Sequence, residues 1–128
     1  MDNPLNVLIY DQQRPVYSAD LPGPLEIGRQ SKDEPAPYHQ RPQGPGWRLV
    51  IARPDEDFIS RKHVLVEPLP AGRARVTNLS DVRPVSLRDG TQLKPKTSCE
   101  TALPLVLTPC CSPLLLTPTC NILPACQQ

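Results

Sequence analysis

Four polar residues that could bind an anion stand together in the sequence, directly before a short apolar run. They are Ser60, Arg61, Lys62 and His63, and residues 64–66 (VLV) follow them. The run is typical of a buried strand, and a strand holds the residues at its entrance in place. A hydroxyl group, two cations and the free N–H groups of a turn are donors that suit a bound anion. The cluster therefore predicts an anion site, although a solvated strand entrance is the common alternative.

The serine and the histidine of this cluster are also residue types that hydrolases use for catalysis. Ser60 could be a nucleophile and His63 its base, with Asp57 as a third group. Such an enzyme needs an exposed, activated serine, and the sequence lacks the Gly-x-Ser-x-Gly turn that presents one in many hydrolases. We therefore expect a binding protein and not an enzyme.

Five cysteines and two histidines raise the question of a metal or redox site. No Cys-x-x-Cys pair occurs, so the ligand spacing of a zinc site is missing. We expect reduced thiols, with a redox or intermolecular disulfide site as the alternative, and we expect neither a metal nor a cofactor. The cysteines are Cys99, Cys110, Cys111, Cys120 and Cys126.

The charge of the chain is nearly balanced, since 14 basic and 13 acidic residues give a formal net charge of +1. The two signs alternate along the chain, whereas nucleic-acid binding usually depends on a strongly basic face. No nucleic-acid partner is therefore expected. The sequence also has no basic leader followed by an apolar run and no apolar segment near the roughly 20 residues that span a bilayer. We expect no membrane partner and a cytoplasmic location.

Proline content decides the fold class. The chain has 128 residues and 18 prolines, and no Pro-free run is longer than the 13 residues of 55–67 and 71–83. These runs lack a helical apolar period, so long helices are excluded and a single all-β domain of many short strands is predicted. The expected strands are residues 5–10, 16–18, 25–27, 47–51, 63–67, 73–79, 85–87, 91–94, 102–108 and 114–117.

Two segments stand outside this strand pattern. Residues 30–46 contain four prolines and two glycines without an apolar run, which predicts a long exposed loop inserted in the domain. From residue 97 onward Glu100 is the only charged residue, and this change of composition suggests a domain at 1–117 and a loose C-terminal tail at 118–128.

Three groups of residues occur in an order typical of one family. Gly28-Arg29 follows an expected strand, Ser60-x-x-His63 precedes another, and Asn78-Leu79-Ser80 is followed by a turn at Asp89-Gly90. In this order and strand context the chain, over about residues 5–117, resembles the forkhead-associated (FHA) domain. The resemblance implies an FHA-like (SMAD/FHA) β-sandwich of about eleven short antiparallel and mixed strands, which binds phosphothreonine peptides through loops at one end.

The resemblance also implies roles for individual residues. Arg29 and Ser60 match the phosphate-binding arginine and serine of the family, and Arg61 matches the next position, which often contacts phosphate. A phosphothreonine carries about −1.5 to −2 charge and three acceptor oxygens, which suit a guanidinium, a hydroxyl and loop N–H groups. Gly28 and His63 match the pair that supports the site structurally.

The loop after residue 78 departs from the family pattern. Here Val82 and Arg83 occupy the positions of the polar residue and the asparagine that bind the peptide in the family. Asparagine can donate and accept hydrogen bonds, whereas arginine can only donate, so recognition of the peptide backbone is expected to differ.

The function implied by the resemblance is that of a non-enzymatic signalling or adaptor module that binds a phosphothreonine-containing protein or peptide. The alternative is a degenerate FHA-like scaffold that mediates protein contacts without reading phosphate. In either case the chain could work alone or as one module of a larger signalling protein.

Overall fold

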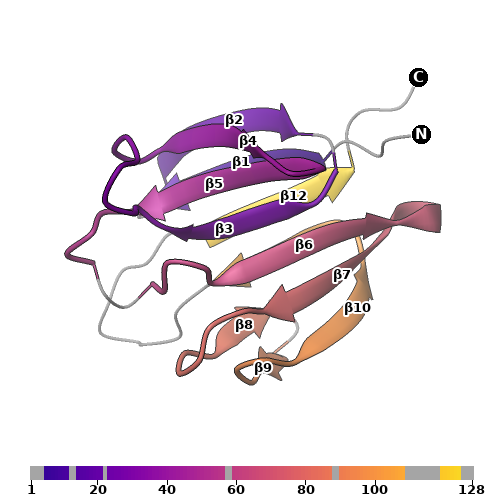
Figure 1. Cartoon of the computed structure of the whole chain (residues 1–128). Coiled ribbons are helices and arrows are strands. Elements are labelled where there is room, and N and C mark those ends of the chain that lie inside the picture. Colours follow the sequence, from indigo (N-terminus) through magenta and orange to yellow (C-terminus); the bar gives the residue numbers. More distant parts are fainter. Residues whose placement is uncertain are drawn as a thin grey trace.

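Two sheets of six strands form the architecture of the chain (Figure 1). The computed structural model describes residues 5–11, 14–21, 23–56, 59–87, 90–108 and 119–124. In spatial order the first sheet contains β2 (Arg14–Leu21), β1 (Leu5–Asp11), β12 (Thr119–Pro124), β11 (Leu105–Thr108), β8 (Val85–Leu87) and β9 (Gln92–Leu93). The second contains β10 (Ser98–Ala102), β7 (Arg73–Asn78), β6 (Val64–Leu69), β3 (Leu25–Arg29), β5 (Gly46–Ala52) and β4 (His39–Gln43). This confirms the all-β sandwich predicted from the sequence.

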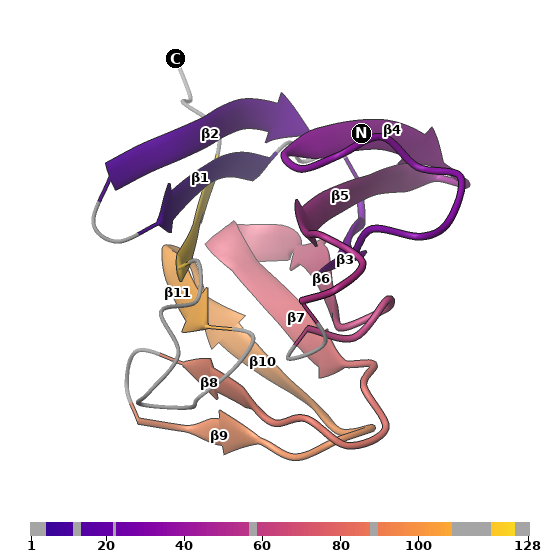
Figure 2. The same ribbon diagram turned by 90° about the vertical axis from the view of Figure 1, so that its left-hand side faces the viewer.

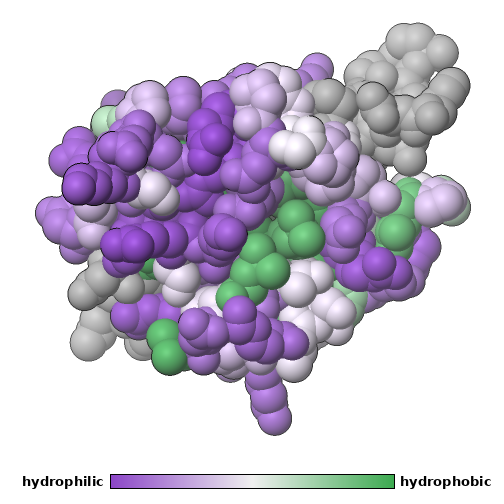
Figure 3. Space-filling view, in the orientation of Figure 1, coloured by the Kyte–Doolittle hydropathy of each residue, from purple (hydrophilic) through white to green (hydrophobic). Residues whose placement is uncertain are grey.

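Alternation of apolar and polar residues builds the core between the two sheets. In β7, Ala74 and Val76 are fully buried while Arg73 and Arg75 are exposed, as expected for a strand with one solvated face. The outer surface seen in Figure 3 is mostly hydrophilic, with apolar side chains gathered in a strip near β6. No helix in the described ranges is long and apolar enough to cross a membrane.

The strand pairings that matter for the site lie in the second sheet. β6 and β7 form the expected antiparallel hairpin, closed by a short 3-10 turn at Pro70–Gly72. β3 lies between β6, its antiparallel neighbour, and β5, its parallel neighbour. A parallel pair needs a long crossover connection, and residues 30–45 supply it. Because β3 ends and β6 begins at the same end of the sheet, Arg29 and the residues before Val64 come together.

The prediction of a long loop at 30–46 is wrong in part, because His39–Gln43 form strand β4 at the edge of the second sheet. Pro42 did not prevent this, because a proline is tolerated in an edge strand. The strand is held from the other sheet as well, where the Tyr17 hydroxyl bonds to the Gln40 side chain. Figure 2 shows β4 and β2 lying side by side at the top of the sandwich.

The expected boundary at residue 117 and loose tail at 118–128 are wrong for Thr119–Pro124. This segment forms β12, which lies between β1 and β11 in the first sheet. Its period of two places Cys120 and Ile122 in the core, both fully buried. Burial raises the pKa of the Cys120 thiol to about 12. The tail prediction rested on composition, which does not reveal so short an alternation.

Two further expected segments are revised or lie outside the described residues. The strand expected at 102–108 is two strands, because β10 ends at Ala102 in the second sheet and β11 starts at Leu105 in the first. The strand expected at 114–117 and Asp89 of the expected hairpin turn are outside the described residues.

Candidate anion-binding site

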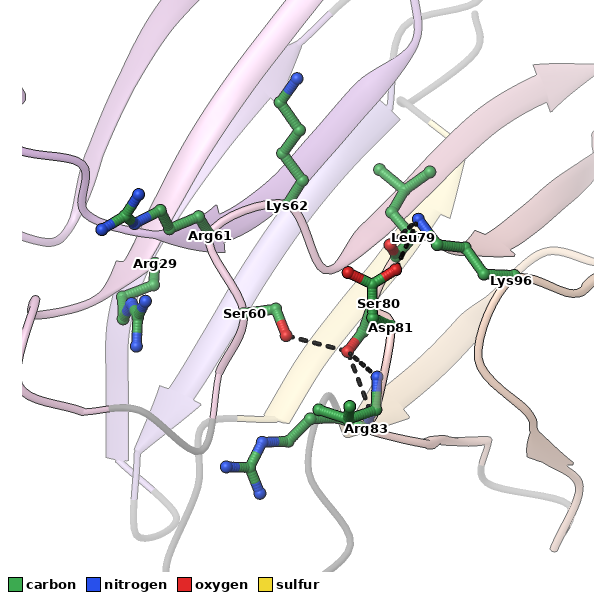
Figure 4. A pocket seen from close by; sticks show the side chains of 10 residues that line it. Arg29, Ser60, Arg61, Lys62, Leu79, Ser80, Asp81, Arg83 and Lys96 are labelled. Atoms are coloured by element: carbon green, nitrogen blue, oxygen red, sulfur yellow. Dashed lines mark hydrogen bonds and ion pairs between the residues drawn. The ribbon is translucent and has the colours of Figure 1, made fainter.

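One end of the sandwich carries a pocket of about 520 Å³ (Figure 4). Four segments meet there: the end of β3, the loop before β6, the loop between β7 and β8, and the turn between β9 and β10. Figure 2 looks onto this end of the molecule. The lining residues are Arg29, Ser60, Arg61, Lys62, Leu79, Ser80, Asp81, Val82, Arg83 and Lys96. The structure thus brings together five of the predicted site residues from three separate parts of the sequence.

Gly28 lets the loop before β6 approach the end of β3. A Cβ atom at this position would lie 1.8 Å from the carbonyl oxygen of Arg61, a distance that no side chain can occupy. The next residue, Arg29, donates its backbone N–H to the carbonyl oxygen of Ser60 over 3.0 Å. The absence of a side chain at residue 28 therefore sets the distance between the two segments that carry Arg29 and Ser60.

His63 is fully buried and does not line the pocket. Its Nδ1 accepts a hydrogen bond from the backbone N–H of Ser60 at 2.9 Å, which fixes the turn between the two residues. Its backbone N–H donates to Ile27, and its carbonyl oxygen accepts from Leu79. His63 thereby joins β3 to both loops of the pocket.

The hydroxyl of Ser60 is oriented by a second serine, Ser80, whose Oγ lies 2.8 Å from the Ser60 Oγ. The Ser80 Oγ accepts hydrogen bonds from the backbone N–H groups of Val82 at 3.2 Å and Arg83 at 2.9 Å. A hydroxyl oxygen has two acceptor lone pairs and one proton, so the Ser80 proton is left to donate to Ser60. The proton of Ser60 then remains available to an anion in the pocket.

Asn78 determines the shape of the loop that carries Ser80 and Arg83. Its buried side-chain amide donates to the carbonyl oxygens of Arg83 at 2.7 Å and Leu93 at 2.9 Å, and its Oδ1 accepts from the N–H of Ser80 at 3.0 Å. The sequence contained Asn78 within the family pattern, but its role as the anchor of this loop was not predicted. A polar amide in line with the buried, apolar face of β7, after Ala74 and Val76, was the available signal.

The arginines of the pocket differ in their surroundings. Arg29 is half-buried, and its Nε, itself buried, has no hydrogen-bond partner among the described residues. Arg61 is exposed, and Arg83 is half-buried. Figure 4 shows the guanidinium groups of Arg29 and Arg61 to the left of Ser60 and that of Arg83 below it. Val82, at the rim of the pocket, is 75% exposed, so the loop presents an apolar and a cationic side chain next to each other.

Arg48 lies beneath the site and was missed by the sequence reasoning. This side chain is 3% exposed, and it donates to the carbonyl oxygens of Arg29 at 2.6 Å and Arg61 at 2.9 Å. It also pairs with Glu26 at 2.7 Å and with Glu34 at 2.6 Å. One buried guanidinium thus holds the backbone of Arg29 and of Arg61, and Glu34 links it to the segment expected to be a loop.

Hydrogen bonding from Arg48 lowers the pKa of Glu34 from 4.5 to about 2. Arg41 donates to the same carboxylate at 2.9 Å from β4. Glu26 and Arg48 are register partners on β3 and β5. A charged residue between apolar neighbours in each of two strands was therefore the signal in the sequence that could have revealed the pair.

The described residues contain no group of three or more His, Cys, Asp or Glu side chains suited to a metal ion. The chemistry of the pocket is that of hydrogen-bond donors and positive charge. It can hold an anion through the Ser60 hydroxyl and the guanidinium groups around it.

Comparison with known proteins supports an all-β sandwich fold and identifies no family. No protein-family model matches the chain, and no curated protein matches it. Among solved structures, the crystal structure of full-length yeast Pml1p is similar, with a TM-score of 0.65 at 14% sequence identity. The similarity covers 94% of this chain and 81% of Pml1p. At this identity the likeness shows a shared fold alone.

Proposed function

We propose that the chain is an FHA-type module that binds phosphothreonine peptides, without enzymatic activity, in a signalling or adaptor role. The observation that carries the proposal is the convergence of Arg29, Ser60, Arg61 and Arg83 on one pocket. Among the described lining residues the one carboxylate is Asp81, which lies 3.2 Å from Lys96 and is paired with it. The pocket thus offers donors and uncompensated positive charge, which a phosphate of about −1.5 to −2 charge would complement.

The orientation of the Ser60 hydroxyl also supports a phosphate ligand. Its proton is left available because Ser80 supplies the other hydrogen bond. The buried Nε of Arg29 is a second donor without a partner among the described residues, and buried donors are normally satisfied. A tetrahedral anion bound between the two would satisfy both.

The test measures binding of a phosphothreonine peptide library and of the same peptides without phosphate. We expect binding that depends on phosphate, and we expect Arg29→Ala and Ser60→Ala to weaken it. Each change removes a charge-assisted hydrogen bond worth about 1.5–3 kcal/mol, or about ten- to 150-fold in affinity. Arg73→Ala is the matched control, because Arg73 is exposed at the start of β7 and does not line the pocket.

The scaffold alternative gives a different result. A scaffold that does not read phosphate would bind a partner equally well with and without the modification, and Arg29→Ala would leave that binding unchanged. Melting curves of each variant separate a loss of binding from a loss of folding. Unchanged affinity in folded Arg29→Ala and Ser60→Ala variants would refute the site.

A further inference from the structure

The positive charge of the pocket exceeds what one phosphate can neutralise. Among the described residues, its lining contains one carboxylate, Asp81, and five cationic side chains. These are Arg29, Arg61, Lys62, Arg83 and Lys96. Lys96 is engaged, since its Nζ lies 3.2 Å from the Asp81 carboxylate and donates to the Leu79 carbonyl oxygen at 2.9 Å. Four cations remain, twice the charge of a phosphothreonine dianion.

The carboxylates beneath the pocket do not compensate these four cations. Glu26 and Glu34 are paired with Arg48, and Glu34 is also paired with Arg41. Among the described residues, no carboxylate lies within ion-pair distance of Arg29, Arg61, Lys62 or Arg83. Like charges gathered at one site repel each other, and a ligand of matching charge relieves the repulsion.

Lys62 is placed apart from the cations that would hold the phosphate. In Figure 4 the guanidinium group of Arg29 lies to the left of Ser60 and that of Arg83 below it, whereas Lys62 extends upward, away from both. The pocket volume of about 520 Å³ is in the range of sites that take ligands much larger than one phosphate group. A second anionic group could therefore sit near Lys62 while a phosphate occupies the space beside Ser60.

We infer that the ligand is a phosphopeptide with a second anionic group close to its phosphothreonine, and that Lys62 is the residue that selects for it. The second group is a carboxylate of an acidic residue or a second phosphate, since both are anionic acceptors for an ammonium group. The inference rests on the proposed function and adds the chemical class of the peptide. The loop before β6, which carries Ser60 and Lys62, would then determine which peptide sequences are preferred as well as bind the phosphate.

The test compares three synthetic peptides with the same phosphothreonine: one flanked by alanines, one flanked by aspartates, and one with a neighbouring second phosphothreonine. We expect the two peptides with additional charge to bind about three- to tenfold more tightly than the alanine-flanked peptide at low salt. This advantage should shrink as salt is raised, because exposed charges are screened. The ratio between the aspartate and the double-phosphate peptides tells which second group is preferred.

The Lys62→Gln variant tests whether Lys62 causes the tighter binding of the peptides with additional negative charge. We expect this variant to lose most of the advantage of the charged peptides and to bind the alanine-flanked peptide within about twofold of the unmodified protein. Lys94→Gln is the matched control, because Lys94 is also exposed but does not line the pocket. It should preserve the advantage.

The outcomes separate this inference from the proposed function. Equal affinity for all three peptides would overturn the inference and leave phosphothreonine binding in place. An equal weakening of all three peptides by Lys62→Gln would also overturn it, because Lys62 would then act on the first phosphate. Absence of any phosphate-dependent binding would overturn the proposed function and this inference with it.

Discussion

Arg48 donates a hydrogen bond from Nη1 to the carbonyl oxygen of Arg61 over 2.9 Å, which ties the loop of the candidate site to strand β5. The same side chain makes four more hydrogen bonds, two to Glu34, one to Glu26 and one to the carbonyl oxygen of Arg29. A guanidinium has five N–H donors, so all of them are used. The site therefore depends on a buried arginine that does not line the pocket.

The first prediction concerns Arg48→Lys, which keeps the charge but leaves three donors where five are needed. We expect a marked loss of stability, approaching the 3–5 kcal/mol typical of breaking a buried ion pair, and weaker phosphopeptide binding by the folded protein. Chemical denaturation measures the stability. Arg41→Lys is the control, since Arg41 also bonds Glu34 but is 45% exposed, and it should cost about 0–1 kcal/mol. Equal effects of the two changes would contradict the role of Arg48.

Gly28→Ala is expected to displace the loop before β6, because its Cβ would lie 1.8 Å from the Arg61 carbonyl oxygen. Overpacking of this kind typically costs about 1–3 kcal/mol. Gly46→Ala is a matched control, since its Cβ would lie 1.9 Å from the Pro24 carbonyl oxygen at the other end of β5. Both variants should lose stability in thermal melts. Only Gly28→Ala should weaken phosphopeptide binding, and a similar loss of binding in Gly46→Ala would show a general effect of unfolding.

Two serines near the site should respond in opposite ways to replacement by alanine. Ser80→Ala removes the acceptor of two backbone N–H groups and the donor to Ser60, so we expect a loss of about 1–3 kcal/mol and weaker phosphate binding. Ser86→Ala removes a buried hydroxyl without a hydrogen-bond partner among the described residues and should be neutral or stabilising. Denaturation curves of both variants test the contrast, which fails if Ser86→Ala is the more damaging change.

The lowered pKa of Glu34 leads to a prediction of how the stability of the fold changes as the pH falls. Its pKa is about 2 in the folded protein and lies near 4.5 in the unfolded chain, so the unfolded state binds the proton more readily. Its contribution to stability is complete above about pH 5 and is lost as the pH falls toward 2. Glu34→Gln should lower stability at neutral pH and flatten the acid dependence between pH 5 and 2. Glu100→Gln, at an exposed ion pair with Arg75, is the control and should cost no more than about 1 kcal/mol at neutral pH.

Local patterns in the sequence were sufficient for most of the strands. The alternation at residues 73–79 and the apolar run before Glu67 predicted β6 and β7 to within two residues at each end, because one face of each strand packs on the core. β4 and β12 were missed for a different reason. β4 has no apolar run, and the alternation in β12 is too short to stand out from the surrounding composition. Both are strands because long-range partners supply their hydrogen bonds.

The candidate site was predictable where single residues face the pocket and unpredictable where residues support it. Arg29, Ser60 and Arg61 could be chosen from residue type and order, and the structure brings them together. Arg48 and Ser80 act through contacts between residues far apart in the chain. A charge among apolar residues marked Arg48 as unusual, but the sequence did not show which groups either side chain would contact.

The register of β1 and β12 pairs Leu5 with Pro124, so the first and last described strands meet at one point of the first sheet. In Figure 1 this point is at the end of the sandwich opposite the end of β3, where Arg29 lies. The start of β1 and the end of β12 are therefore neighbours in space. A circular permutant that joins Pro124 to Leu5 through a short linker and opens the exposed turn at Pro70–Gly72 would keep every strand pairing except the turn itself, and would leave the pocket intact.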